Sequence, residues 1–478
     1  MIGTDPTAPL PLAAGLAPRT GSQGWVTSLI MVVALSVALL LPALWNGFPL
    51  LYFDTVDYVS MGFTWKLPIY RTAGYGFIAL AGWAMQTVWA TLVLQSLFMA
   101  YVLFESWRLL APELRGWRLA VVVVFAFLLT SLPWVTSLLM PDVFTAAVVL
   151  LTLMLALRDD ALVPARRWTF IVLLGIACMA HPTHVTLVAG LTICIWVLSL
   201  LARKGWPFVT MKTGGVAAGL VLGVVLSLGT NWLVTGRIFL APRTTPLLTF
   251  AVLFEQGLGE RYLAETCDAP GEHQSVFCPY RADLPTGANQ FLWHNEALWK
   301  AGGWNELPAK VAVDLEIILQ RYPLEFIAGA ARLTAEQLVV IRTGEGFRTM
   351  VGFVDGEIAR FYPRDNAAFL GARQQSYPEI WDSPIPRINT IHVPVMLGCL
   401  VLLVGMIVLA IRRRERTAAT VATLVSLAYL GNAFICGAIS NPADRYGSRL
   451  AWLTAVTAVV LLIRLVRPAT SETSSAAG

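Results

Sequence analysis

The sequence predicts an all-α polytopic membrane protein with one large hydrophilic loop, and three observations support this prediction. Of the 478 residues, 57% are hydrophobic and only 13% are charged, about half of the ~25% in a typical globular protein. Residues 237–391 hold 32 of the 63 charged residues, 14 of them basic and 18 acidic. The other charges lie in short clusters between long apolar runs. Soluble multidomain, coiled-coil and disordered chains are thereby excluded.

The apolar runs are long enough to cross a bilayer core of about 30 Å. They are residues 25–46, 88–110, 119–139, 141–158, 169–202, 213–234, 392–411, 418–439 and 450–466. The run 169–202 is too long for one helix, and Pro182 within it disfavours a helical conformation at His181. Dividing the run there predicts about ten helices, seven before the large loop and three after it. We expect residues 47–87 to form the first outer loop.

Lysine and arginine are unevenly distributed over the connections between these helices. With the N-terminus in the cytoplasm, the cytoplasmic side holds Arg19, Arg108, Arg115, Arg118, Arg158, Arg166, Arg167, Arg203, Lys204, Lys212, Arg412, Arg413, Arg414, Arg416, Arg464 and Arg467. The short outer loops hold only Lys66, Arg71, Arg445 and Arg449. Because basic residues concentrate in cytoplasmic connections, we expect both termini in the cytoplasm and the large loop outside. In a bacterial cell this corresponds to the inner membrane with a periplasmic loop.

Five segments follow from this topology. We expect a disordered cytoplasmic tail, an N-terminal transmembrane module of about seven helices, a periplasmic loop domain between helices seven and eight, a C-terminal transmembrane module of about three helices, and a cytoplasmic tail. Their bounds are 1–24, 25–236, 237–391, 392–466 and 467–478. In the loop domain, residues 307–321 and 324–342 are predicted helices that Pro323 separates. Cys267 and Cys278 are a disulfide candidate because the periplasm is oxidising.

The polar residues near the membrane gather on the predicted outer face. Ionisable groups at membrane depth are costly, so they usually carry function. The outer set comprises Asp54, Asp57, Arg71, Asp142, His181, His184, Asp444, Arg445, Tyr446 and Arg449. The cytoplasmic connections carry mainly basic residues. The sequence therefore predicts a functional site on the outer face, under the large loop.

Each of these residues also has a purely structural interpretation. Asp54 and Asp142 both stand where a helix begins, so each could serve only as a helix cap. Asp57 shares a helix face with Asp54 and is expected to support it. Arg71 could be an anchor at the membrane interface. The clustering favours a catalytic role for Asp54 and supporting roles for Asp57 and Asp142.

Neither a metal site nor nucleic-acid binding has support in the sequence. His181 and His184 are spaced to bind a metal, but no acidic third ligand accompanies them, so we expect them to line a polar cavity. No metal or other cofactor is predicted, although Asp54 and Asp142 together could hold a divalent cation. The net charge of +5 arises from basic residues at the ends of apolar runs, and we expect no nucleic-acid partner.

The order of these features resembles the GT-C superfamily of membrane glycosyltransferases, near the protein mannosyltransferase and lipid A aminoarabinose transferase type. Residues 70–76, Tyr-Arg-Thr-Ala-Gly-Tyr-Gly, resemble the recurrent R-x-P-G-Y-P segment of the family, with Ala73 and Gly76 in place of the prolines. Further matching positions are Asp54 in the first outer loop, Gln95 in the next helix, Asp142 in the second outer loop and the late pair Arg445-Tyr446. The resemblance covers the seven N-terminal helices better than the C-terminal part, and the large loop matches nothing in it.

The resemblance implies a fold and a reaction. Such enzymes take a sugar from a polyprenyl-phosphate carrier at the outer face and transfer it to a glycan, lipid or protein. Asp54 would deprotonate the acceptor hydroxyl. Cationic side chains would balance the lipid phosphate, and the candidates are Arg71, Arg243, Arg445 and Arg449. The substrate cavity would be lined by Tyr58, Tyr75, His181, His184 and Tyr446. Membrane lipid is a further expected partner.

Two other functions remain as alternatives. Another lipid-linked transferase, such as a polysaccharide ligase or polymerase, tends to have an Arg/His-rich outer loop, whereas this loop has only His273 and His294 beside its basic residues. A lipid or solute transporter often shows internal repeats and polar residues at the membrane midplane. Here we find no repeat and the polar residues stay at one face. Glycosyl transfer is therefore the favoured prediction.

Overall fold

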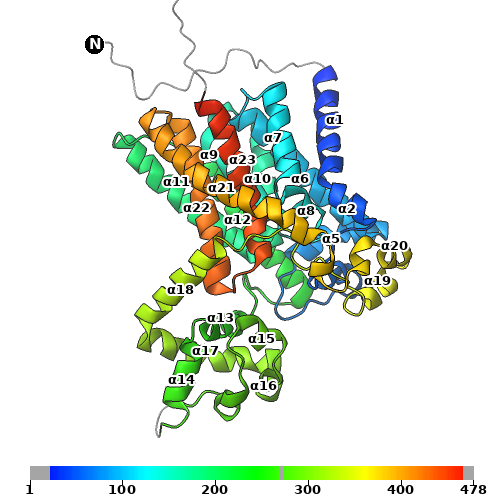
Figure 1. The fold of residues 1–478 in the computed structure, drawn as a ribbon, viewed down its shortest axis with the longest axis vertical. Coiled ribbons are helices and arrows are strands. Elements are labelled where there is room, and N and C mark those ends of the chain that lie inside the picture. Colours follow the sequence, from blue (N-terminus) through cyan, green and yellow to red (C-terminus); the bar gives the residue numbers. More distant parts are fainter. Residues whose placement is uncertain (1–21, 270–272, 467–478) are drawn as a thin grey trace, which may run out of the picture.

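The structure, a computed structural model, describes residues 22–269 and 273–466, and Figure 1 shows these residues as a helical bundle with a helical unit projecting from one end. The described backbone has one isolated β-bridge, between Leu50 and Leu138. Six described helices are long and apolar enough to cross a membrane: α6 (Val88–Leu110), α11 (Pro182–Arg203), α12 (Gly214–Thr235), α21 (Ile385–Arg412), α22 (Arg416–Ile439) and α23 (Asp444–Leu465). The described part of the chain is therefore all-helical, and its long apolar helices mark a membrane-embedded protein, as the composition predicts.

The interior of the bundle is formed around α9 (Val143–Arg158), which continues as the short η1 (Asp159–Ala161). Every residue of α9 up to Ala156 is buried. Its neighbours include α6, α10 (Pro164–Ala180), α11 and α23. A helix that is apolar on all sides belongs in the interior, and α9 is enclosed by protein helices. The predicted run 141–158 is thus helical, but it is shorter than the ~20 residues of a full crossing.

Two predicted spans are each divided into two helices, so the prediction of one continuous helix in each is wrong. The pairs are α1 (Ser22–Leu39) with α2 (Leu41–Asn46), and α7 (Trp117–Leu128) with α8 (Leu132–Ser137). Pro42 and Pro133 lie in the first turn of the second helix of each pair. Proline lacks the amide donor and clashes with the carbonyl four residues earlier, which ends the preceding helix. The break predicted at His181, between α10 and α11, is confirmed.

The first outer loop contains helices that the sequence analysis missed. They are α3 (Thr55–Val59), α4 (Met61–Thr64) and α5 (Gly74–Met85). With 12 residues, α5 is too short to be recognised as a membrane span, yet it packs against α6 and α10. The predicted tails 1–24 and 467–478 lie outside the described residues, except that α1 begins at Ser22.

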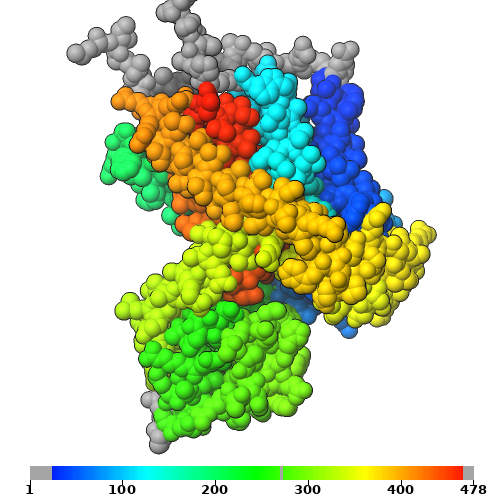
Figure 2. Space-filling view, in the orientation of Figure 1, coloured from blue at the N-terminus to red at the C-terminus, as the bar shows by residue number. Residues whose placement is uncertain are grey.

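Residues 237–391 form two differently packed parts rather than one core. The first part has its own core and contains α13 (Thr245–Glu255), α14 (Leu258–Thr266), η2 (Cys278–Asp283), α15 (Ala288–Trp293), α16 (Glu296–Lys300) and α17 (Gly303–Arg321). A disulfide joins Cys267 to Cys278, whose Cα atoms are 5.3 Å apart. The predicted helices 307–321 and 324–342 correspond to α17 and to α18 (Pro323–Gln337). Figure 2 shows this unit below the bundle.

The second part returns to the bundle and covers its end. It contains α19 (Asp355–Phe361), α20 (Asn366–Leu370), η3 (Arg373–Ser376) and η4 (Ile380–Asp382). Its apolar residues Met350, Ile358 and Phe369 share a core with Phe48 and Leu92. Figure 1 shows α19 and α20 beside α2 and α5. The large hydrophilic segment thus contributes a cover over the first outer loop, and this arrangement brings its residues 343–347 to the site described next.

Candidate functional site

Asp54 and Arg71 form the centre of a charged cluster at the outer-loop end of the bundle. An Arg71 Nη2 atom makes an ion pair with Asp54 Oδ1, and both side chains are partly buried. Asp54 precedes α3, but its side chain makes no capping hydrogen bond. Its carboxylate is therefore used for contacts with arginine, and the structural interpretation of Asp54 as a simple helix cap does not hold.

Asp57 shares Arg71 with Asp54, as the helical spacing of the two acids predicts. Arg71 Nε donates a hydrogen bond to Asp57 Oδ2 at 2.9 Å. The guanidinium also lies over the rings of Tyr58 and Tyr70, 5.7 and 5.2 Å from their centroids. Burial raises the pKa of Asp57 above its ordinary value, although Arg71 opposes this shift by favouring the charged form. Arg71 is thereby fixed by two carboxylates and two aromatic faces.

The backbone after Arg71 is held by buried amides. Asn231 Oδ1 accepts a hydrogen bond from the Ala73 amide at 2.8 Å. The Tyr75 hydroxyl donates to Gln95 Oε1 at 2.7 Å, and Gln95 Nε2 donates to the carbonyls of Thr136 and Leu138. A buried amide whose partners are all satisfied fixes its neighbours. This network therefore ties the Arg71 segment to the segment that precedes Asp142.

Gly74 is required where this segment meets α10. A Cβ atom at Gly74 would lie 1.8 Å from the backbone carbonyl oxygen of Met179. We expect Gly74→Ala to lower the thermal unfolding midpoint of the detergent-purified protein, because overpacking a buried contact costs roughly 1–3 kcal/mol. Gly398→Ala is the matched control, since a Cβ there meets nothing within 4 Å. Equal midpoints for the two variants would contradict this prediction.

Arg445 connects Asp54 to a second acidic residue. Its Nη1 atom lies 3.4 Å from Asp54 Oδ2 and 3.9 Å from Asp142 Oδ2. Its guanidinium lies over the Tyr52 ring, 4.3 Å from the centroid. The Nε atom is buried and has no hydrogen-bond partner among the described residues. Because a buried donor without a partner is costly, this atom is a ready contact for a ligand anion.

Asp142 and Arg449 form the most deeply buried pair of the cluster. Both side chains are 3% exposed, and Arg449 Nη1 lies 3.1 Å from Asp142 Oδ1. Asn432 Oδ1 accepts from Arg449 Nε and Nη2, at 3.2 and 2.8 Å. Asp142 precedes α9 without a capping hydrogen bond. This pair therefore joins α9, α22 and α23 below the cluster.

Several residues predicted to line a substrate cavity are packed inside the protein instead. His184 is fully buried; its ring nitrogens contact the Thr145 hydroxyl at 3.0 Å and the Ala177 carbonyl at 2.8 Å. Tyr75 is fully buried as well, and Tyr58 is 3% exposed. No ring nitrogen of His184 is left for a ligand. The sequence pattern located these residues at the correct end of the bundle but could not show which way they point.

The other predicted site residues differ in whether they reach the cluster. His181 caps α11, where its Nδ1 accepts a hydrogen bond from the Thr183 amide at 3.3 Å. Tyr446 is partly exposed, and its hydroxyl accepts a hydrogen bond from Arg445 Nη2 at 3.3 Å. Arg243 is exposed and makes no ion pair in the described part of the chain. The structure thus gathers Arg71, Arg445 and Arg449 but leaves Arg243 out.

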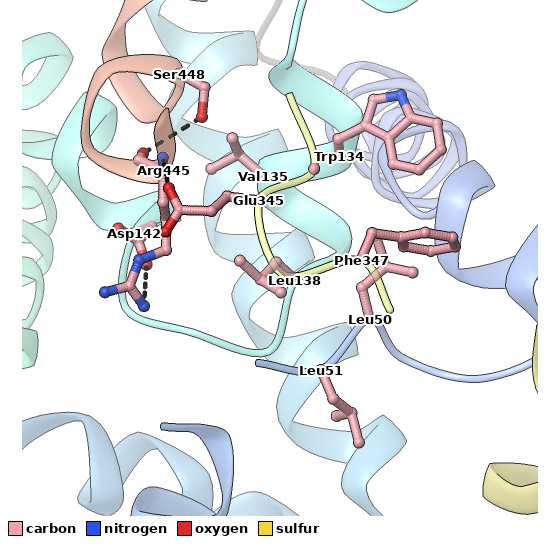
Figure 3. A pocket seen from close by; sticks show the side chains of 11 residues that line it. Leu50, Leu51, Trp134, Val135, Leu138, Asp142, Glu345, Phe347, Arg445 and Ser448 are labelled. Atoms are coloured by element: carbon pink, nitrogen blue, oxygen red, sulfur yellow. Dashed lines mark hydrogen bonds and ion pairs between the residues drawn. The ribbon is translucent and has the colours of Figure 1, made fainter. Parts of the chain in front are cut away.

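A small recess of about 30 Å³ lies beside this cluster. Figure 3 shows the polar side chains of Asp142, Glu345 and Arg445 together on one side, with apolar side chains on the other. The full lining is Leu50, Leu51, Trp134, Val135, Leu138, Asp142, Gly344, Glu345, Phe347, Arg445 and Ser448. The recess therefore has an apolar wall that ends at a guanidinium and two carboxylates.

Glu345 is a site residue that the sequence analysis missed. Its carboxylate accepts hydrogen bonds from the Tyr52 hydroxyl at 3.1 Å and from the Arg445 amide at 2.5 Å. Burial raises its pKa above the ordinary value, against the opposing effect of Arg445. Glu345 lies in the large loop, and the neighbouring residues form no regularly spaced motif that would indicate a site. The flanking Gly344 and Gly346 are the one sequence signal that could have marked it.

Among the described residues, no group of three or more His, Cys, Asp or Glu side chains is arranged to hold a metal ion. The acids of the cluster are each paired with arginine, tyrosine or a backbone amide. The buried Nε atom of Arg445, which has no partner among the described residues, is suited to contact an anion, and the carboxylates are suited to accept a proton. Comparisons with protein-family models, with curated proteins and with solved structures gave no match to this chain.

Proposed function

We propose that the chain is a membrane glycosyltransferase that moves a sugar from a polyprenyl-phosphate carrier to a glycan, lipid or protein acceptor. The observation that carries this proposal is the recess, whose apolar wall ends at Arg445, which in turn lies 3.4 Å from the Asp54 carboxylate. An apolar wall that ends in a cation suits the phosphate end of a prenyl phosphate, and the recess of about 30 Å³ would have to widen to admit it. A carboxylate beside it suits deprotonation of an alcohol.

The proposed reaction is an inverting displacement. The oxygen of the acceptor hydroxyl forms a bond to the anomeric carbon of the sugar, and Asp54 receives the hydroxyl proton. The bond between the anomeric carbon and the phosphate oxygen breaks, and its electron pair leaves with the prenyl phosphate. Charge develops on that phosphate in the transition state, where a fixed cation stabilises it most.

The arginines of the cluster supply this cation. The buried Nε atom of Arg445 has no partner in the described structure, so a phosphate there would satisfy it. Arg71 already holds two carboxylates, and a bound phosphate would compete with Asp54 for its guanidinium. This competition would free an Asp54 oxygen for the acceptor. Arg243, which lies outside the cluster, has no part in this proposal.

We further propose that the site faces the periplasm of a bacterial cell, with the chain in the inner membrane. The six long apolar helices are supplemented by α9, α10 and the divided pairs α1–α2 and α7–α8, which together would give ten crossings. The distribution of Lys and Arg favours cytoplasmic termini. A polyprenyl-phosphate donor fits this side, where nucleotide sugars are absent.

Mass spectrometry of lipids and envelope glycans from a deletion strain tests the function. We expect one sugar substituent to disappear and the corresponding prenyl-phosphate sugar to accumulate, and we expect the wild-type chain to restore the product. Glu336→Gln, an exposed position on α18, should restore it equally well. An unchanged set of glycans and lipids would contradict glycosyl transfer and favour transport.

A further inference from the structure

The charges around the recess do not balance. Three guanidinium groups face four carboxylates, and the members are Arg71, Arg445, Arg449, Asp54, Asp57, Asp142 and Glu345. Asp142 has its own cation, Arg449, at 3.1 Å. The hydrogen bonds that Glu345 accepts come from neutral groups, the Tyr52 hydroxyl and the Arg445 amide. The recess therefore contains a carboxylate whose hydrogen-bond donors carry no charge.

Glu345 is placed at this position by its backbone. Gly344 and Gly346 on either side have φ angles of 80° and 77°, a region that favours glycine. A Cβ atom at Gly346 would lie 2.5 Å from the Tyr52 ring, and one at Gly344 would lie 2.8 Å from Ile385. Gly346 thus allows the large loop to approach the first outer loop closely, and Gly344 allows it to approach the start of α21. As a result, Glu345 and Arg445 share the same recess wall.

The proposed donor and the spent carrier differ in charge. A sugar linked through phosphate to a prenyl chain is a phosphodiester with one negative charge. The leaving prenyl phosphate is a monoester with a second pKa of about 6, so it carries nearly two negative charges above neutral pH. A fixed carboxylate in a partly buried recess repels the second charge strongly, because the local dielectric is low.

We propose that Glu345 makes the recess selective for a prenyl phosphodiester over a prenyl phosphomonoester, so that the spent carrier is expelled after transfer. This inference rests on the proposed function and adds a role for a residue outside the transfer step itself. Three other charged groups lie near Glu345. Arg445 attracts either ligand, whereas Asp142 and Asp444 add to the repulsion of a ligand phosphate. A merely structural Glu345, which anchors the loop to the first turn of α23, would affect both ligands equally.

Isothermal titration calorimetry of the full-length protein in detergent at pH 8 tests the inference with two probes, geranyl phosphate and geranyl methyl phosphate. We expect the wild-type protein to bind the diester more tightly. Glu345→Gln should bind the monoester about tenfold more tightly than wild type, equivalent to about 1.4 kcal/mol. Its affinity for the diester should change less than about twofold. Glu336→Gln, an exposed glutamate of the same loop, should match wild type.

Three results would overturn the inference: equal wild-type affinity for both probes, an unchanged monoester affinity in Glu345→Gln, or equal changes for both probes. Glu345→Asp keeps the charge and should keep the discrimination, which tests the inference even if the glutamine variant does not fold. Failure of the wild-type protein to bind either probe would instead contradict the proposed function. The two proposals therefore fail in distinguishable ways.

Discussion

Replacing Asp54 with asparagine is expected to abolish sugar transfer while the protein remains folded. The amide keeps the size of the side chain and one oxygen for Arg71, but it cannot accept the proton of an acceptor hydroxyl. Removal of a general base typically costs ~100- to 10,000-fold in rate. The measurement is transfer from a prenyl-phosphate sugar in membrane vesicles, with folding checked by size-exclusion chromatography.

Asp57→Asn is the matched comparison, since Asp57 contacts the same Arg71 but lies outside the contact between Asp54 and Arg445. Its loss of activity should be smaller. Undiminished transfer in a folded Asp54→Asn protein would contradict the assignment of the base. Glu345 would then be the next candidate: Glu345 and Asp142 both line the recess, but Asp142 is 3% exposed and paired with Arg449.

The fold was predictable from sequence where a single apolar run forms a single helix. The bounds of α6 are those of the predicted run 88–110, and Pro182 marked the break at His181. Pro42 and Pro133 act in the same physical way, but each stands in a continuous apolar run whose length alone suggested one crossing. The length of each apolar run predicts a single helix, whereas the proline within the run determines where the first helix must end.

The charged cluster could be predicted because its acids and arginines follow apolar runs at one end of the bundle. Asp54, Arg71, Asp142 and Arg445 all entered the prediction for this reason. The direction of a side chain cannot be inferred from such a pattern, and Tyr75, which the sequence predicts to line a cavity, is fully buried. Helix spacing fixes a face, but burial depends on which neighbours cover that face.

The sequence does not predict Glu345 and Asn432 as site residues, and the reason differs from that for Tyr75. Glu345 reaches the site through a fold of the large loop, nearly 300 residues from its partner Tyr52 in the chain. Such a contact follows from tertiary packing, and the local residues Gly344 and Gly346 only permit it. Asn432 lies within the apolar helix α22, where the sequence shows only an isolated polar residue. Its role follows from the contact with Arg449, which the sequence does not reveal.

Arg449→Leu is expected to destabilise the protein more than any surface change, because it removes the nearer cation of the buried Asp142 and leaves only Arg445, 3.9 Å away. Breaking a buried ion pair by removing one partner typically costs about 3–5 kcal/mol, most of it from the unpaired charge. The Asp142→Asn/Arg449→Leu double variant removes that charge as well and should recover much of the loss. The measurement is the midpoint of thermal unfolding in detergent for the two single variants and the double variant.

Arg464→Leu on the same helix provides the control. Arg464 pairs with Glu113 and Glu415 at 3.8 and 3.7 Å and is 29% exposed, so its loss should cost less than about 1 kcal/mol. If Arg449→Leu unfolds at the same temperature as Arg464→Leu, the pair with Asp142 does not hold the helices together. If the double variant is no more stable than Arg449→Leu, the cost arises from lost packing of the arginine rather than from the charge left on Asp142. Recovery in the double variant would show that Asp142 and Arg449 act as one neutral unit beneath the site.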